Sequence, residues 1–286
     1  MSDFGSVSGL LAYAAAHDMP LWRAVQTLDC GEQDLAPEAS WEKMARMLAV
    51  MRESDAAYDR GIRSTSGLIG GDAGKMADYV SEGHTLGGTL LGKIIAAALR
   101  MGECNACMKR IVAAPTAGAC GVLPAVLLPC GEELASDDSA LIEALYVAAG
   151  IGSVIAARAS ISGAECGCQA EIGSASAMAA AALVHLRGGT AEQMANAAAL
   201  ALKGLLGLVC DPVGGLVEVP CVKRNVIGAV NALSAAEMSL AGIESRIPPD
   251  EVFDAMAEIG AALPPSLRET GEGGLAATPT GRQYAP

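Results

Sequence analysis

Residues 174–186 read SASAMAAAALVHL, an alanine-rich run with no alternation of β-branched and polar side chains. Alanine has the highest helix propensity, and the missing alternation argues against a strand. Residues 141–157 show the same pattern, and residues 86–101 also have helical spacing. The sequence therefore predicts helices that pack closely through small side chains.

The composition extends this prediction to the whole chain. Of the 286 residues, 52% are apolar but only 3% are aromatic, so Ala, Val, Leu, Ile, Met and Gly must fill the interior. Residues 6–58 read as two amphipathic helices with a cap at Ser40. The only strand-like run, residues 215–222, contains Pro220, which weakens that interpretation. We expect an all-α fold in one domain, residues 1–286, with an N-terminal helical part (1–60) and a core (61–286).

Charge and apolar patterning exclude several classes of function. A net charge of −13 and a pI near 4.6 disfavour binding to nucleic acid or to an anionic membrane. Residues 111–131 have the length of a membrane span but contain three prolines, so we expect a buried loop that leads into a short helix. No signal peptide is recognisable at the N-terminus, which predicts a cytoplasmic protein whose nine cysteines are thiols or metal ligands.

Three glycine-rich breaks between helices, residues 114–121, 160–173 and 204–220, are the expected locations of the chemistry. Cys168, Cys210 and Cys221 each lie on a turn marked by Gly or Pro. Three thiolates can hold a cubane iron–sulfur cluster and leave one iron without a protein ligand, and such an iron can act as a Lewis acid. The alternatives are buried apolar fillers or a zinc site that adds Cys166 to the three.

The remaining cysteines give weaker signals. Cys104 and Cys107 form a CxxC pair, but no second pair completes a four-thiolate site. Cys120 and Cys130 flank an apolar segment and are interpreted as packing residues, while Cys30 has no assigned role.

Five segments together identify a family resemblance. They are TSGLIGGDAGKM (65–76), APTAGACGVLPAVL (114–127), ASISGAECGCQAEIGSASAMAAAALV (159–184), LGLVCDPVGGLVEVPCVKRN (206–225) and RETGEGGLAATPTG (268–281). With them the chain resembles the alpha subunit of the bacterial iron–sulfur-dependent L-serine dehydratases. The family spaces its three cluster cysteines by forty-one and then ten intervening residues, and Cys168, Cys210 and Cys221 reproduce both intervals.

The resemblance implies a [4Fe-4S] cluster on these three cysteines, no pyridoxal phosphate, and conversion of L-serine to pyruvate and ammonia. It also implies an oligomer with a beta subunit that supplies the regulatory, substrate-contacting domain. Two features depart from the family pattern. Cys166 stands where relatives usually have Gly, and the C-terminal cysteine tail of some single-chain members does not follow Pro286.

Substrate-binding residues follow mostly from the resemblance, supported by hydroxyls and glycine amides that suit an anion. They are Ser64, Thr65, Ser66, Gly67, Thr116, Gly118, Lys223, Arg224, Asn225, Arg268 and Thr270. The general base is unknown: His84 is a weak candidate, and we favour a base from the partner chain. A cluster lyase for L-cysteine or L-threonine and a non-enzymatic metal or redox sensor stay open as alternatives.

Overall fold

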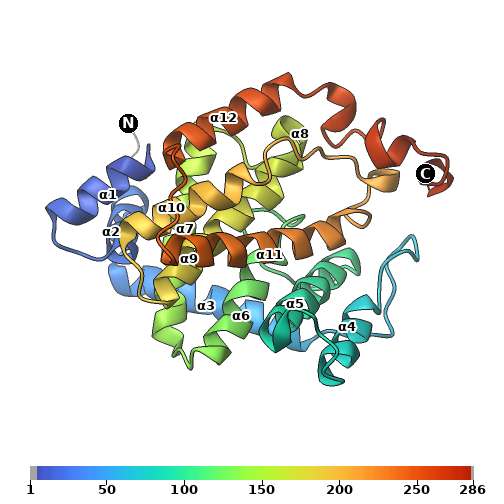
Figure 1. The fold of residues 1–286 in the computed structure, drawn as a ribbon, viewed down its shortest axis with the longest axis horizontal. Helices are drawn as coiled ribbons and strands as arrows, with labels where there is room; N and C mark the ends of the chain where they lie inside the picture. Colours follow the sequence, from blue (N-terminus) through green and yellow to red (C-terminus); the bar gives the residue numbers. More distant parts are fainter. Residues whose placement is uncertain (1–4, 285–286) are drawn as a thin grey trace.

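Helices joined by loops form the fold of residues 5–284, the part of the chain that the computed structural model describes (Figure 1). The α-helices are α1 (Val7–Ala16), α2 (Leu21–Gln33), α3 (Pro37–Ala56), α4 (Asp72–Ser81), α5 (Gly88–Ala106), α6 (Val122–Glu133), α7 (Asp138–Arg158), α8 (Gly163–Cys166), α9 (Ser174–Leu186), α10 (Ala191–Lys203), α11 (Cys221–Leu240) and α12 (Pro249–Ala262). Short turns complete them: the π-turn η1 (Gln169–Gly173) and the 3₁₀ turns η2 (Val213–Gly215), η3 (Pro265–Leu267), η4 (Gly274–Ala277) and η5 (Gly281–Tyr284). The predicted all-α fold class is confirmed.

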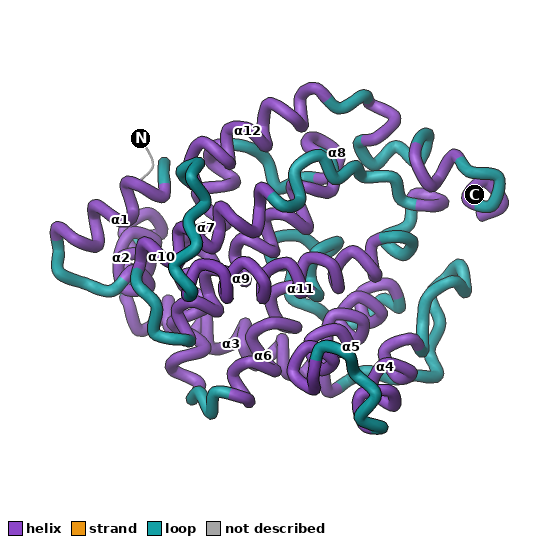
Figure 2. The backbone as a smooth tube through the Cα atoms, viewed as in Figure 1, coloured by secondary structure: helices purple, strands orange, loops and turns teal. Residues whose placement is uncertain are grey.

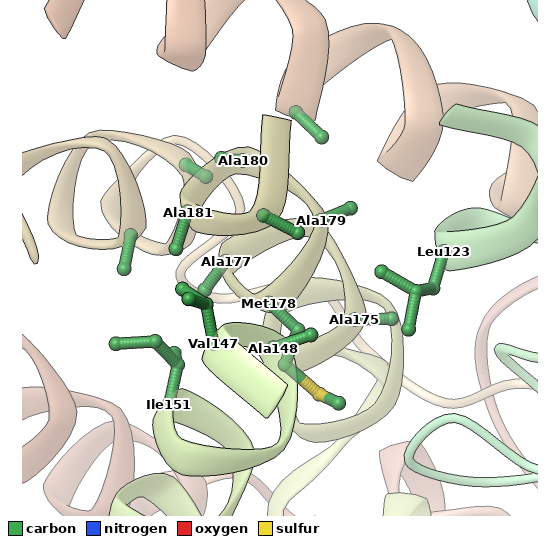
Figure 3. Close-up of a cluster of buried hydrophobic side chains, with 14 of the residues drawn as sticks. Leu123, Val147, Ala148, Ile151, Ala175, Ala177, Met178, Ala179, Ala180 and Ala181 are labelled. Atoms are coloured by element: carbon green, nitrogen blue, oxygen red, sulfur yellow. The ribbon is translucent and has the colours of Figure 1, made fainter. Parts of the chain in front are cut away.

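Helix α9 is the centre of the bundle. Every side chain from Ser174 to Val184 is buried, and α6, α7, α10 and α11 pack around it. Figure 3 shows Val147, Ala148 and Ile151 of α7 and Leu123 of α6 around its alanines. Because alanine adds only one methyl group, neighbouring helices approach closely and fill the interior without large aromatic side chains.

Helix α7 is the one described helix that is long and apolar enough to cross a membrane by length and composition. Its apolar window is 67% buried inside the fold, and the helix packs against α9, α2 and α3. These contacts account for its apolar character as that of a core helix.

The N-terminal part differs from the sequence prediction. Three helices, α1 to α3, replace the expected two, and Ser40 lies inside α3 instead of capping it. Helix α3 begins at Pro37, a residue favoured in the first helical turn because it lacks an N–H to leave unpaired. Ser40 is buried, and its Oγ hydrogen-bonds the Tyr146 hydroxyl at 2.8 Å.

The other local predictions hold with shifted boundaries. A loop leads into the short buried helix α6, as the prolines of residues 111–131 predict. Residues 215–222 form a turn and the start of α11, and the described residues contain no strand, only one isolated bridge between Cys210 and Arg268. In Figure 2 a group of loops lies between α8 and the C-terminal end of the chain.

Close packing through small residues is testable at Gly228 in α11. A Cβ at this position would lie 2.9 Å from both Ile172 Cγ2 and Val122 Cγ2. We expect Gly228→Ala to lower the free energy of unfolding by about 1–3 kcal/mol, measured by urea denaturation. Gly31→Ala in α2 is the matched control, because no atom lies within 4 Å of its new Cβ. This substitution should raise the free energy of unfolding by about 0.5–1 kcal/mol. Equal unfolding midpoints for the Gly228 variant and the wild type would contradict the tight contact.

Candidate functional site

The three predicted cluster cysteines come from three separate segments. Cys168 lies between α8 and the π-turn η1, Cys210 lies in the loop after α10, and Cys221 is the first residue of α11. All three are buried. Backbone hydrogen bonds hold the Cys210 segment in place, because its N–H donates to the Leu267 carbonyl (2.9 Å) and its carbonyl accepts from the Glu269 N–H (2.8 Å). The C-terminal segment therefore fixes the position of Cys210.

The thiols of Cys168 and Cys210 lie close enough to affect each other's protonation. Their interaction lowers the pKa of Cys168 and raises the pKa of Cys210, so the two thiols titrate as a pair. The Arg224 guanidinium also lowers the pKa of Cys168. Burial, with smaller contributions from Cys168 and Glu171, raises the pKa of Cys221 to about 12. Cys168 is thus the thiol most readily present as the thiolate that binds metal.

The arrangement differs from a single-ion site. Within residues 5–284 no group of three or more His, Cys, Asp or Glu side chains is placed to hold one metal ion. Cys166, the fourth member of the zinc alternative, instead faces α12, where its thiol donates to the Met256 carbonyl at 3.3 Å. A cubane cluster makes a different demand, because each cysteine binds a different iron and the sulfurs need not converge on one point.

Arg224 supplies positive charge beside the thiols. Its Nη2 donates to Asp211 Oδ1 (2.7 Å) and its Nη1 to the Val209 carbonyl (2.8 Å). Burial alone would lower the pKa of Arg224, but the negative groups of Cys168 and Asp211 outweigh burial and raise it. Asp211 Oδ2 also accepts from the Leu275 N–H (2.8 Å). This pair joins α11, the Cys210 loop and the C-terminal segment behind the cysteines.

Glu171 is a residue that our sequence analysis missed. It lies in the π-turn three residues after Cys168, and its Oε1 accepts a hydrogen bond from the Thr116 hydroxyl at 2.7 Å. Burial raises the pKa of Glu171; the Thr116 bond opposes this and the nearby Glu269 adds to it. An acidic residue so close to a candidate ligand in a glycine-rich segment was the available signal, and π-turns occur frequently at functional sites.

Residues 64–73, which include the predicted substrate residues Ser64 to Gly67, do bind carboxylates, but these carboxylates belong to the protein itself. Ser64 and Ser66 both donate to Glu218 Oε2, Ser64 at 2.6 Å. Glu103 accepts from the backbone N–H groups of Gly71, Asp72 and Ala73 at 3.0, 2.8 and 3.2 Å. The segment thereby anchors the loop before Cys221 and the start of α4, and contact of Ser64 and Ser66 with a substrate stays a prediction.

The neighbouring residues of that turn make fewer contacts. Thr65 is exposed, and Gly67 adopts a positive φ of 77° that permits the turn. Gly118 approaches Glu171 so closely that a Cβ on it would lie 2.9 Å from Oε1. Thr116 and Gly118, two of the predicted substrate residues, therefore meet at the Glu171 carboxylate.

Asn225 and Lys223 mainly connect segments of the protein. The Asn225 amide is buried; it donates to the carbonyls of Gly118 (2.8 Å) and Cys221 (3.0 Å) and accepts from the Gly121 N–H (2.8 Å). Lys223 Nζ donates to Asp72 Oδ2 at 2.7 Å. These bonds hold the 118–121 loop and α4 against the first turn of α11.

Arg268, Thr270 and His84 complete the predicted set. The backbone of Arg268 forms the bridge to Cys210, and its buried Nε has no hydrogen-bond partner among the described residues. The Thr270 hydroxyl donates to the Pro265 carbonyl (3.2 Å). His84 is exposed and pairs with Glu82 (3.4 Å), so its contacts do not join it to the cysteines.

Fold and site together define a helical protein with a buried thiol site rimmed by glycine-rich loops. A family described as "Serine dehydratase alpha chain" matches residues 16–276. The chain is 53% identical to the "Probable L-serine dehydratase, alpha chain" of Bacillus subtilis over 86% of this chain and 82% of that one. It is 59% identical to the protein of the same description from Latilactobacillus sakei, over 64% of this chain and 88% of that one. It is 48% identical to the "L-serine dehydratase, alpha chain" of Peptoniphilus asaccharolyticus, over 76% of this chain and 74% of that one.

The chain belongs to the serine dehydratase alpha chain family. Several relatives named "L-serine dehydratase" without the words alpha chain match it over only 40% of their own length. Those relatives therefore carry substantial sequence beyond the part that corresponds to this chain.

Proposed function

We propose that this chain is the catalytic subunit of an L-serine dehydratase that releases pyruvate and ammonia and holds a [4Fe-4S] cluster on Cys168, Cys210 and Cys221. The observation that carries the proposal is that the three cysteines are buried around Arg224. Arg224 lies three residues after Cys221, its guanidinium donates to the Val209 carbonyl next to Cys210, and it lowers the pKa of Cys168. Thiolates bind iron–sulfur clusters, and a nearby cation offsets their negative charge.

The residues around the thiols fit such a group. No side chain extends from Gly163 toward Cys210, since a Cβ there would lie 3.0 Å from its Sγ. Nine free cysteines among the described residues suit a reducing compartment such as the cytoplasm. When bound, the cluster supplies a Lewis-acidic iron for the substrate hydroxyl.

The protein's own residues bind and orient the substrate. Thr116 and its glycine-rich turn lie against Glu171, and Arg224 keeps positive charge near the thiols. Apolar packing of α9 behind the site limits access of water. A beta subunit is proposed to supply the remaining domain, including the general base, because the longer relatives contain additional sequence.

The test is anaerobic reconstitution with iron and sulfide, followed by assays with and without the matching beta chain. We expect a broad visible absorption band, about four irons per chain, and pyruvate from L-serine when both chains are present. Sulfide release from L-cysteine, or 2-oxobutanoate from L-threonine, at a higher kcat/KM would assign those substrates instead. Stoichiometric zinc without lyase activity would overturn the proposal, and full activity of this chain alone would exclude a base from the partner.

A further inference from the structure

The carboxylate of Glu171 lies against two glycine-rich segments, at Gly118 and at Gly163. A Cβ on Gly118 would lie 2.9 Å from Oε1, and a Cβ on Gly163 would lie 2.9 Å from Oε2. The same Cβ on Gly163 would lie 3.0 Å from Cys210 Sγ. The carboxylate and the candidate cluster ligand are thus close enough to contact one small molecule together, with no side chain of either glycine between them.

Glu171 is only partly buried, and it accepts fewer hydrogen bonds from the protein than the buried carboxylates Glu103, Glu218 and Asp211. Glu103 accepts hydrogen bonds from three backbone N–H groups, and Glu218 accepts them from two serine hydroxyls. Asp211 accepts one bond from an arginine and one from a backbone N–H. Glu171 accepts one bond, from Thr116 to Oε1, and no described Lys, Arg or His pairs with it. A carboxylate offers about four acceptor positions, so the partly buried Glu171 keeps acceptor positions that no described residue uses.

We propose that Glu171 binds the α-ammonium group of the substrate. This inference rests on the proposed function and makes it more specific. A hydroxy amino acid has a hydroxyl, a carboxylate and an ammonium group, and the last requires an acceptor of negative charge. Oε2 has no donor among the described residues, while Thr116 holds Oε1 and fixes the direction of the carboxylate. The site therefore selects primary amines over hydroxy acids that are otherwise identical.

The test compares L-serine with 3-hydroxypropanoate, which is serine without its ammonium group. In the reconstituted two-chain enzyme, Glu171→Gln should raise the KM for L-serine by about 10- to 100-fold, the range of a hydrogen-bonded ion pair. The inhibition constant of 3-hydroxypropanoate should change by less than about threefold, because this compound makes no such pair. Iron content and far-UV circular dichroism are recorded for each variant.

Two further variants sharpen the test. Glu165→Gln is the matched control, because Glu165 lies in the same glycine-rich segment (160–173) but is exposed and accepts a hydrogen bond from Ser160 (2.6 Å). This variant should leave the KM for L-serine and the inhibition constant of 3-hydroxypropanoate unchanged. Glu171→Asp keeps the charge and should retain part of the preference for L-serine, which provides a second measurement if Glu171→Gln does not fold.

The outcomes separate the inference from the proposed function. Absence of pyruvate formation by the wild type would overturn both. With an active wild type, equal weakening of L-serine and 3-hydroxypropanoate would mean a merely structural role and would overturn the inference. A lower kcat with an unchanged KM would also overturn it, since that pattern indicates a group that acts only in the transition state.

Discussion

Replacing Cys168 with alanine is expected to abolish the cluster and lower pyruvate formation by more than about a hundredfold. The reason is that changing residues around a metal ligand already costs 10- to 100-fold in affinity or activity, so losing a ligand itself should cost more. Cys168 also has the lowered pKa, so its substitution removes the thiolate that is most readily available. The measurements are iron per chain, visible absorption after reconstitution, and pyruvate formed with the beta chain present.

Cys166→Ser is the matched control for this prediction. Cys166 is two residues away and equally buried, but its thiol donates to the Met256 carbonyl on α12. A serine hydroxyl can keep that bond, so iron content and activity should stay near those of the wild type. Iron retained by Cys168→Ala and lost by Cys166→Ser would refute the assignment of the ligands.

Arg224→Met is expected to lower the free energy of unfolding by about 3–5 kcal/mol, because it leaves a buried charge without its partner. Asp211 is 3% exposed and would keep only the Leu275 N–H as a donor. Urea denaturation of the chain without its cluster measures the effect and separates it from any loss of iron. Arg224→Lys should recover part of the loss, since it restores charge but lacks the planar fork of donors.

An exposed ion pair provides the control for this second prediction. Arg52 binds Asp138 at 2.7 Å, but the two side chains are 44% and 67% exposed. Arg52→Met should therefore cost less than about 1 kcal/mol. If the two arginine variants unfold at the same urea concentration, burial of the Arg224–Asp211 pair does not control its contribution.

Local sequence was sufficient for most helices. The alanine-rich pattern of residues 174–186 predicts α9 with its observed boundaries, because helix propensity and apolar spacing act over a few neighbouring residues. The same reasoning predicted the loop before α6, because the prolines of residues 111–131 argue against a membrane span. It failed at Ser40, which lies inside a helix that begins at Pro37 and is buried against Tyr146, a residue 106 positions away.

Prediction of the site was likewise limited to features that are local in the sequence. Cysteine spacing and glycine-rich turns pointed to Cys168, Cys210 and Cys221, but they did not show that the first two thiols affect each other's pKa. Hydroxyls in residues 64–66 were read as substrate contacts because nothing local shows that Glu218, 154 positions from Ser64, accepts their hydrogen bonds.

The sequence by itself determined the helical class and the small-residue core through composition and periodicity, and its motifs identified the family and predicted the three ligand cysteines. Only the tertiary structure decided which carboxylates have several donors within the protein and which has one. Thr116 and Glu171 are 55 residues apart, and no local pattern encodes their 2.7 Å contact. Glu171 is partly buried, and the acceptor positions of its carboxylate that no protein donor uses are open to water or to a bound substrate.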